Sequence, residues 1–459
     1  MSGEVASRLF KGVFANSFSQ SVTVVIQLVS VPLLLFFWGV DLYGEWLVLS
    51  AIPVYLSMSD LGFGAGAANE MTMLVAKGNR KSALETFQSV SVLVSIVSAT
   101  LAMILVLVNE YLPWETWFQF SILGRSDIVQ VILLLGCYVL VGLQLSLLEA
   151  GFRCDGNYAK GTFFLALLRL FEYLVMFVAV FLGGGVVAAA LSFLIIRVIG
   201  IIGLMLMLRR LSPWITYGYS HARVNTIKQL TSPAISFMAF PLGNALSMQG
   251  MIMAIGAVLG PSSVVVFSII RTVSRIALQG MGLINSSVWP ELSMAFGKGD
   301  FELVRRLHRL SCQLSFWLSN ILIIILLICG DVLIRIWTRG KVEIDYELFV
   351  LMMAVIFANS FWYTSSVVHV AVNRHQKMAA LYLLGTGASL LLATWLLPIL
   401  GLNGAAIALL AVDCFMAIYV VMGSISLTRD GVRPFIKQIF SIKQIFNYRG
   451  WYEKKISSN

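Results

Sequence analysis

Residues 378–399 read MAALYLLGTGASLLLATWLLPI and contain no charged side chain. A helix rises about 1.5 Å per residue, so a stretch of this length can cross the roughly 30 Å of hydrocarbon in a bilayer. Of the 459 residues, 59% are hydrophobic and only 12% are charged. A soluble domain carries about twice that share of charged residues. The stretch therefore predicts one span of a multi-pass membrane protein.

Similar apolar stretches recur along the whole chain. They predict an all-α polytopic protein of about twelve transmembrane helices, at 13–38, 46–74, 85–108, 128–150, 161–182, 186–208, 233–258, 262–288, 312–336, 348–372, 378–399 and 403–427. The first is too long for a signal-peptide core and lacks a small-residue cleavage site, so we expect it to stay as a helix.

Lysine and arginine are distributed unevenly between the predicted loops. With a cytoplasmic N-terminus, the inward loops and the two tails hold 24 of the 32 Lys and Arg, and the opposite side holds only Arg125, Arg335, Arg339 and Lys341. This bias predicts both termini in the cytoplasm. The net charge of +10 then reflects topology, and we expect no nucleic-acid partner.

Other classes of site find no support in the sequence. The five cysteines have no spacing typical of a disulfide or a metal site, so no metal and no cofactor are expected. The outward loops, about 109–127 and 337–347, are too short to bury a core and hold no histidine. We therefore expect a protein that is not an enzyme.

The two halves of the chain resemble each other at an offset of 221 residues. The identical pairs are Gly39/Gly260, Glu70/Glu291, Met73/Met294, Lys77/Lys298 and Gly78/Gly299. They mark a helix start, and an acidic helix end followed by a Lys-Gly turn. We interpret this as a six-helix unit occurring twice, with residues 1–220 and 221–432 as two lobes around a central cavity and 433–459 as a cytoplasmic tail.

Four predicted helices carry polar residues along one face. The stripes are Asn16, Gln20, Thr23, Gln27 and Ser30; Ser57, Asp60, Gly64 and Ala67; Arg271, Arg275, Gln279, Gly282 and Ser286; and Asn359, Tyr363, Ser366, His369 and Asn373. Any single stripe can be explained by hydrogen bonds between helices. Four stripes at equivalent places in two halves favour a hydrated cavity, whose predicted substrate-binding residues are Arg271, Arg275, Gln279, Gln27, Asn16, His369 and Asn373.

Arg271 and Arg275 give the sharpest signal because a charge inside a span costs about 2.5–3.5 kcal/mol without a partner. They lie one turn apart, and two guanidinium groups on one face could bind a phosphate or pyrophosphate. The alternative is a salt bridge to Asp60 or Glu149 of the other half.

The remaining intramembrane charges suggest local pairs and coupling sites. Arg169 with Glu172, and Glu149 with Arg153, are spaced to pair along one helix. Arg197 and Asp413 have no local partner in the sequence. Asp60, Glu149 and Asp413 are the candidate carboxylates for coupling to a proton or Na⁺.

The stretch SDLGFGAGAANE, residues 59–70, places small residues directly after Asp60. Gly62 and Gly64 begin small-xxx-small pairs that permit close helix packing and also ease bending. The stretch fits a moving gate and a static crossing equally well.

The tail segment RPFIKQIFSIKQIFNYR, residues 433–449, alternates apolar and basic residues. It predicts an amphipathic helix that lies on the inner leaflet, or alternatively a docking site for other proteins.

Three segments together resemble a known family. LYGEWLVLSAIPVYLSMSDLGFGAGAANEM (42–71), WPELSMAFGKGD (289–300) and RCDGNYAKG (153–161) are similar to Wzx-type polysaccharide flippases of the multidrug/oligosaccharidyl-lipid/polysaccharide exporter superfamily. The motifs are loose, while the helix plan covers nearly the whole chain.

The resemblance implies that a lipid-linked oligosaccharide, an undecaprenyl-pyrophosphate O-antigen or capsule unit, is flipped from the inner to the outer leaflet of a bacterial inner membrane. The expected partners are membrane lipids and the glycan polymerisation machinery. A two-lobed transporter can work as a monomer, and we expect a monomer here. The rival is a cation-coupled multidrug antiporter of the same superfamily. Such antiporters use a carboxylate in the first helix, and residues 12–40 contain none. A polymerase or ligase is disfavoured because no large outer loop is present.

Overall fold

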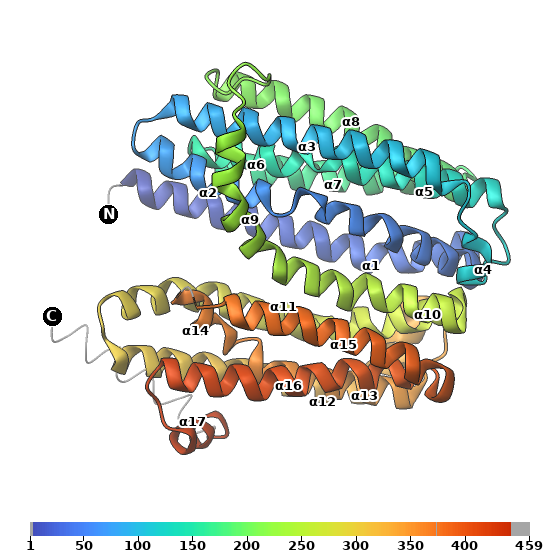
Figure 1. The fold of residues 1–459 in the computed structure, drawn as a ribbon. Helices are drawn as coiled ribbons and strands as arrows, with labels where there is room; N and C mark the ends of the chain where they lie inside the picture. The colour runs from blue at the N-terminus through green and yellow to red at the C-terminus, as the bar shows by residue number, and fades with distance from the viewer. Residues whose placement is uncertain (1–2, 373, 442–459) are drawn as a thin grey trace. The chain divides into compact units, whose positions relative to one another are not determined.

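The computed structural model describes residues 3–372 and 374–441, except for the side chains of 3–10, 60, 232–237 and 277. Every regular element within these ranges is helical. Contacts divide the chain into two compact units, Met1–Val265 (unit 1) and Val266–Asn459 (unit 2), each a bundle of long helices (Figure 1). The lobe boundary at residue 220 stays a prediction.

Unit 1 contains α1 (Gly3–Val54), η1 (Tyr55–Asp60), α2 (Phe63–Ala76), α3 (Arg80–Asn109), α4 (Trp114–Phe118), α5 (Arg125–Gly142), α6 (Gln144–Cys154), α7 (Tyr158–Phe181), α8 (Val186–Leu211), α9 (Val224–Ala245), η2 (Leu246–Gly250) and α10 (Met251–Leu259). Helix α11 (Pro261–Gly297) begins in unit 1 and continues into unit 2. Unit 2 further contains α12 (Phe301–Thr338), α13 (Tyr346–Trp362), α14 (Ser366–Ala371), α15 (Gln376–Leu400), α16 (Leu402–Leu427) and α17 (Val432–Ile439).

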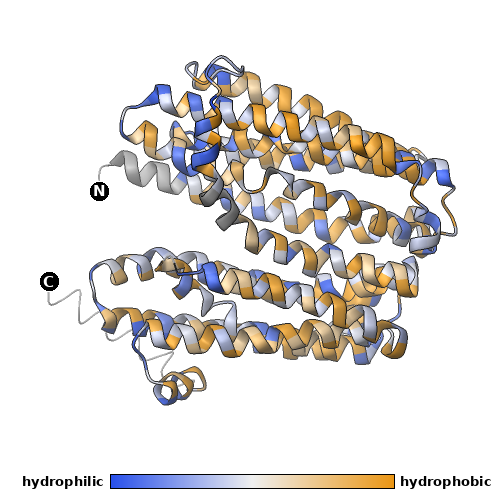
Figure 2. Cartoon of the chain, in the orientation of Figure 1, coloured by the Kyte–Doolittle hydropathy of each residue, from blue (hydrophilic) through white to orange (hydrophobic). Residues whose placement is uncertain are grey.

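Eleven helical segments of the described chain are long and apolar enough to span a membrane, against about twelve predicted. The difference lies in Lys11–Ser59, a 49-residue segment that turns at Gly39, where φ is 74° and ψ is −175°. At about 1.5 Å per residue it is more than twice the thickness of the hydrocarbon, so it holds the predicted span 13–38 and the first part of the predicted span 46–74. Figure 2 shows hydrophobic residues along these helices. The chain is a multi-pass membrane protein.

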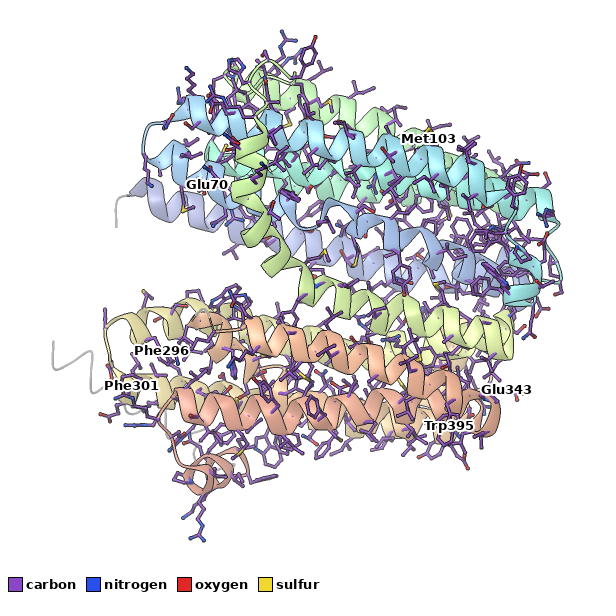
Figure 3. All side chains as sticks on the ribbon, viewed as in Figure 1. Glu70, Met103, Phe296, Phe301, Glu343 and Trp395 are labelled. Atoms are coloured by element: carbon purple, nitrogen blue, oxygen red, sulfur yellow. The ribbon has the colours of Figure 1, made fainter. Side chains whose placement is uncertain are left out.

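The outer faces of both units carry apolar side chains, as a lipid environment requires. Met103 of α3 is 59% exposed and Trp395 of α15 is 66% exposed. Figure 3 labels both residues. In water such side chains would be unfavourable, whereas lipid tails solvate them.

The Lys-Gly turn predicted to repeat has the same geometry in both places. Gly78 and Gly299 have φ of 78° and 71°, a left-handed conformation that favours glycine. The next residue caps the following helix each time: Asn79 accepts from the Ser82 amide at 3.1 Å, and Asp300 from the Leu303 amide at 3.0 Å. The repeated sequence thus encodes a repeated turn.

The second predicted span is interrupted beside the small-residue stretch. The 3₁₀ segment η1 ends at Asp60, and Leu61 and Gly62 follow with φ of 48° and 78°. Gly64, Ala67 and Ala68 are buried in α2, which contacts α3 and α6. The small residues at 62–68 therefore permit both the helix break at its start and the close packing of α2 against its neighbouring helices.

The loop between α4 and α5 is held by a buried carboxylate that the sequence did not mark as a candidate. Glu45 of α1 is 1% exposed. Its Oε1 accepts from the Ser121 and Ile122 amides at 2.6 and 2.8 Å, and its Oε2 accepts from the Leu123 amide at 2.9 Å. Gln119 in the same loop donates to the Ala257 carbonyl of α10 at 2.9 Å. The loop is thereby fixed to two helices.

Substitution of Glu45 by glutamine should lower the free energy of unfolding by about 1.5–3 kcal/mol, because hydrogen bonds to a charged acceptor are lost and an amide NH₂ then faces backbone donors. Denaturant unfolding of the purified protein measures this. Glu115→Gln is the matched control, since Glu115 pairs with Arg125 at 3.6 Å while both side chains are part-exposed. Such a pair is worth about 0–1 kcal/mol. Equal losses in the two variants would refute the role of Glu45.

The structure describes the tail predicted at 433–449 only as far as residue 441. Helix α17 covers Val432–Ile439, and residues 442–459 lie outside the described part of the chain. Arg309 of α12 holds the start of this segment: its Nε lies 2.7 Å from Asp430 Oδ2, and its Nη2 also binds the carboxylate. Burial acts to raise the pKa of Asp430, but hydrogen bonds from Arg309 and the Gly431 amide bring it below its ordinary value of 3.8.

Asp430→Asn should destabilise unit 2 at neutral pH by about 1–3 kcal/mol. Because the folded pKa is depressed, the contribution of Asp430 is present above pH 3.8 and is lost as the pH falls through the folded pKa. The stabilities of wild type and variant should therefore converge below about pH 3.8. Unfolding followed from pH 7 to pH 3 checks this, and a gap that is constant with pH would contradict it.

Candidate functional site

The predicted arginine pair lies on α11 within a polar cluster of unit 2. Arg271 is buried and Arg275 is part-buried, one turn further along the helix. The Arg271 guanidinium lies 5.5 Å from the Phe267 ring centroid. Tyr382 of α15 lies within electrostatic range of both arginines, and Tyr363 within range of Arg275. The two cationic groups of α11 therefore interact with residues of α15 and of the segment after α13.

Asp413 of α16 is the acid of this cluster, and its charge acts on Arg271. The carboxylate is 8% exposed. Its Oδ1 accepts from Asn359 Nδ2 at 2.9 Å and from Trp362 Nε1 at 2.7 Å. The Trp362 ring lies 5.6 Å from the Tyr382 ring. The sequence left Asp413 without a partner, and Trp362 and Tyr382 were missed because aromatic residues in a span give no distinct signal.

We use the name arginine cluster for Arg271, Arg275, Asn359, Trp362, Tyr363, Tyr382 and Asp413. It contains two guanidinium groups and one carboxylate, so it can attract an anion more strongly than a cation. The forked donors of arginine suit phosphate oxygens, and the aromatic rings suit the apolar face of a sugar or a planar molecule.

The other predicted substrate residues of unit 2 lie in different surroundings. Gln279 is exposed on α11. His369 is buried in α14 against α16, with Nε2 3.3 Å from the Val420 carbonyl oxygen. Asn373 lies outside the described residues. The predicted stripe also crosses a break, because α13 ends at Trp362 and α14 begins at Ser366.

The predicted residues of unit 1 are mostly exposed. Asn16 and Gln27 lie on an exposed face of α1, and Asn16 accepts from the Tyr158 hydroxyl at 3.1 Å. Glu149 is exposed on α6, with Arg153 in electrostatic range. The side chain of Asp60 lies outside the described part of the chain, so its predicted coupling role stays a prediction. The same holds for gating by Gly62 and Gly64.

The predicted pair of Arg169 and Glu172 is wrong. Glu172 is 1% exposed and binds Arg197 of α8, with Nε–Oε1 at 2.5 Å and Nη2–Oε2 at 2.9 Å. The Tyr138 hydroxyl donates to Glu172 Oε2 at 3.1 Å. Arg169 instead donates to Thr23 Oγ1 at 2.8 Å. Spacing along one helix was a poor guide because α5 and α8 both pack beside this part of the bundle.

No protein-family model matches the sequence, and no curated protein matches it significantly. Solved structures do match. The inward-facing conformation of a multidrug resistance MATE family transporter of the MOP superfamily is 14% identical, with a TM-score of 0.66, over 88% of this chain and 98% of that one. The chain has a MATE-type transporter fold.

Two further structures share this fold. The MATE multidrug transporter DinF-BH, solved as a complex, is 16% identical, with a TM-score of 0.63, over 92% of this chain and 95% of that one. A MOP superfamily transporter from Pyrococcus furiosus is 12% identical, with a TM-score of 0.58 and the same coverages of 92% and 95%; its binding pocket is described as having reverse polarity, which suggests a different function. At these identities the likeness of the MATE-type neighbours concerns the fold.

Proposed function

We propose that the chain is a membrane transporter that works by alternating access and moves a lipid-linked oligosaccharide, with its pyrophosphate, from the cytoplasmic to the outer leaflet. The arginine cluster carries this proposal. The forked donors of two arginines on one helix face can bind the oxygens of a phosphate or pyrophosphate. The resemblance of segments 42–71 and 289–300 to Wzx-type flippases supports the same substrate class.

Multidrug antiport is the second candidate, and the solved neighbours favour it, because those that were matched include transporters described as multidrug transporters. Asp413 could then bind the coupling cation or the drug. Against this, α1 carries no acid between residues 12 and 40, and Arg271 and Arg275 would repel a cationic drug. The neighbour with a binding pocket of reverse polarity is a precedent for a different function on this fold.

Lipid extracts of a deletion strain distinguish the two candidates. Under the flippase proposal, lipid-linked repeat units accumulate and surface polysaccharide is lost, and wild-type protein reverses both effects. An unchanged lipid profile together with altered sensitivity to cationic drugs would support antiport instead. Arg271→Ala/Arg275→Ala should fail to reverse these effects. The matched control is Arg209→Ala/Arg210→Ala, which changes two exposed arginines at the end of α8 and should restore the lipid profile as wild type does.

A further inference from the structure

Helix α17 has one face fixed against the protein. Phe435 and Ile439 are 1% and 4% exposed and pack in a cluster with Cys312 and Phe316 of α12. Phe435 also stacks on His308, with ring centroids 4.9 Å apart. Trp317 Nε1 donates to the Ile439 carbonyl at 3.0 Å. These contacts fix the rotation of α17 about its own axis, so its remaining faces have a defined direction.

A second, apolar face of α17 stays largely exposed among the described residues. Val432, Ile436 and Phe440 are 40%, 48% and 54% exposed, and the Phe440 ring also makes an edge contact with Phe316 of α12, with ring centroids 5.1 Å apart. They recur every fourth residue, so they form one stripe along the helix. The exposed Arg433 and Lys437 form a parallel basic stripe, and α17 contains no acidic residue.

The order of these faces around the helix is informative. At about 100° per residue, the buried stripe is followed by the exposed apolar stripe and then by the basic stripe. A helix that rests against a membrane protein at the bilayer surface meets protein, hydrocarbon and anionic headgroups in that same order. A water-soluble partner would not require this order.

The position of α17 in the chain agrees with such a surface. The membrane span Leu402–Leu427 ends only four residues before Val432. Asp430, the one acid in this connection, is already paired with Arg309. The basic stripe therefore has no acidic side chain of α17 or of the preceding connection left to neutralise it.

We propose that Val432, Ile436 and Phe440, with Arg433 and Lys437 beside them, form a docking surface for the anionic lipid leaflet at this end of the spans. The apolar stripe enters the acyl region, and the basic stripe binds headgroup phosphates. Because α17 is fixed to α12, the leaflet then holds unit 2 at a defined depth. This inference does not depend on the transported substrate.

Spin labels on the full-length protein in phospholipid nanodiscs test the proposal. Single cysteines replace Ile436 or Phe440 after Cys137, Cys329 and Cys414 are changed to alanine, which leaves the buried Cys154 and Cys312 in place. A label at Ile328, which is 74% exposed in the α12 span, is the lipid reference; a label at Tyr219, which is 83% exposed in a loop, is the aqueous reference.

In nanodiscs that contain phosphatidylglycerol, the ratio of oxygen to aqueous nickel accessibility at 436 and 440 should be several-fold above that at 219 and close to that at 328. Arg433→Gln/Lys437→Gln should lower the ratio, as should replacement of phosphatidylglycerol by phosphatidylcholine or a high salt concentration. Ratios at 436 and 440 equal to that at 219 would overturn the proposal. Protection of positions 436 and 440 from both probes would also overturn it, because protein would then cover the face. A ratio that is unchanged by Arg433→Gln/Lys437→Gln would overturn it as well.

Discussion

Transport of a prenyl-pyrophosphate-linked oligosaccharide into proteoliposomes is expected to fall at least about 100-fold in Arg271→Ala/Arg275→Ala. Each arginine would lose hydrogen bonds to a charged partner, worth about 1.5–3 kcal/mol, and each 1.4 kcal/mol is tenfold in rate or affinity. Lysine at both positions should restore transport only in part, since an ammonium group keeps the charge but cannot bind two oxygens as a fork.

The thermal stability of these variants separates substrate binding from folding. Arginines that act on substrate can be removed without destabilising the protein, because a buried charge is then taken out of the membrane. Full transport activity in the alanine variant would remove the arginine cluster from the mechanism. If the double alanine variant loses thermal stability, and the double lysine variant regains both stability and transport, then Arg271 and Arg275 have a structural role.

Glu172→Gln is expected to destabilise unit 1 by about 3–5 kcal/mol. It leaves Arg197 without its buried counterion, and breaking one partner of such a pair is more harmful than removing both. The Arg197 side chain is 15% exposed, so water screens it little. The measurement is denaturant unfolding in detergent micelles.

A double-mutant cycle provides the control for Glu172. Arg197→Gln/Glu172→Gln should recover part of the lost stability, because an amide pair can still hydrogen-bond across α7 and α8 without a net charge. Equal destabilisation by the single and double variants, or none by either, would contradict the assignment of this ion pair.

Much of the fold could be predicted from the sequence, because membrane spans are set by local composition. Residues 378–399 need no tertiary information to be identified as a span. The turn at Gly78 and Gly299 could also be predicted, since glycine and the following cap act within a few residues. The break at Leu61 was not predicted. The break at 363–365 could not be, because side chains of α12 bind it: Thr364 bonds Ser315, and Ser365 bonds His308.

For the candidate site, the sequence could predict only which charged residues lie inside membrane spans, where a charge is energetically unfavourable. Arg271 and Arg275 stand out because charge is rare in a span, whereas the partners of a charge depend on which helices are neighbours. For this reason Glu172 was paired with the wrong arginine, and Asp413 with none. Glu45 was missed because its partners are backbone amides, which every loop contains and no sequence pattern marks.

Direct binding to the purified protein is the most decisive measurement for the central proposal. A short-chain prenyl-pyrophosphate oligosaccharide and ethidium, a cationic dye, would be titrated into wild type and Arg271→Ala/Arg275→Ala. We predict that wild type binds the pyrophosphate compound, that the double substitution weakens this binding at least about 100-fold, and that ethidium binding is not weakened. Tight binding of ethidium with no measurable binding of the pyrophosphate compound would contradict the proposal and establish drug transport as the better account.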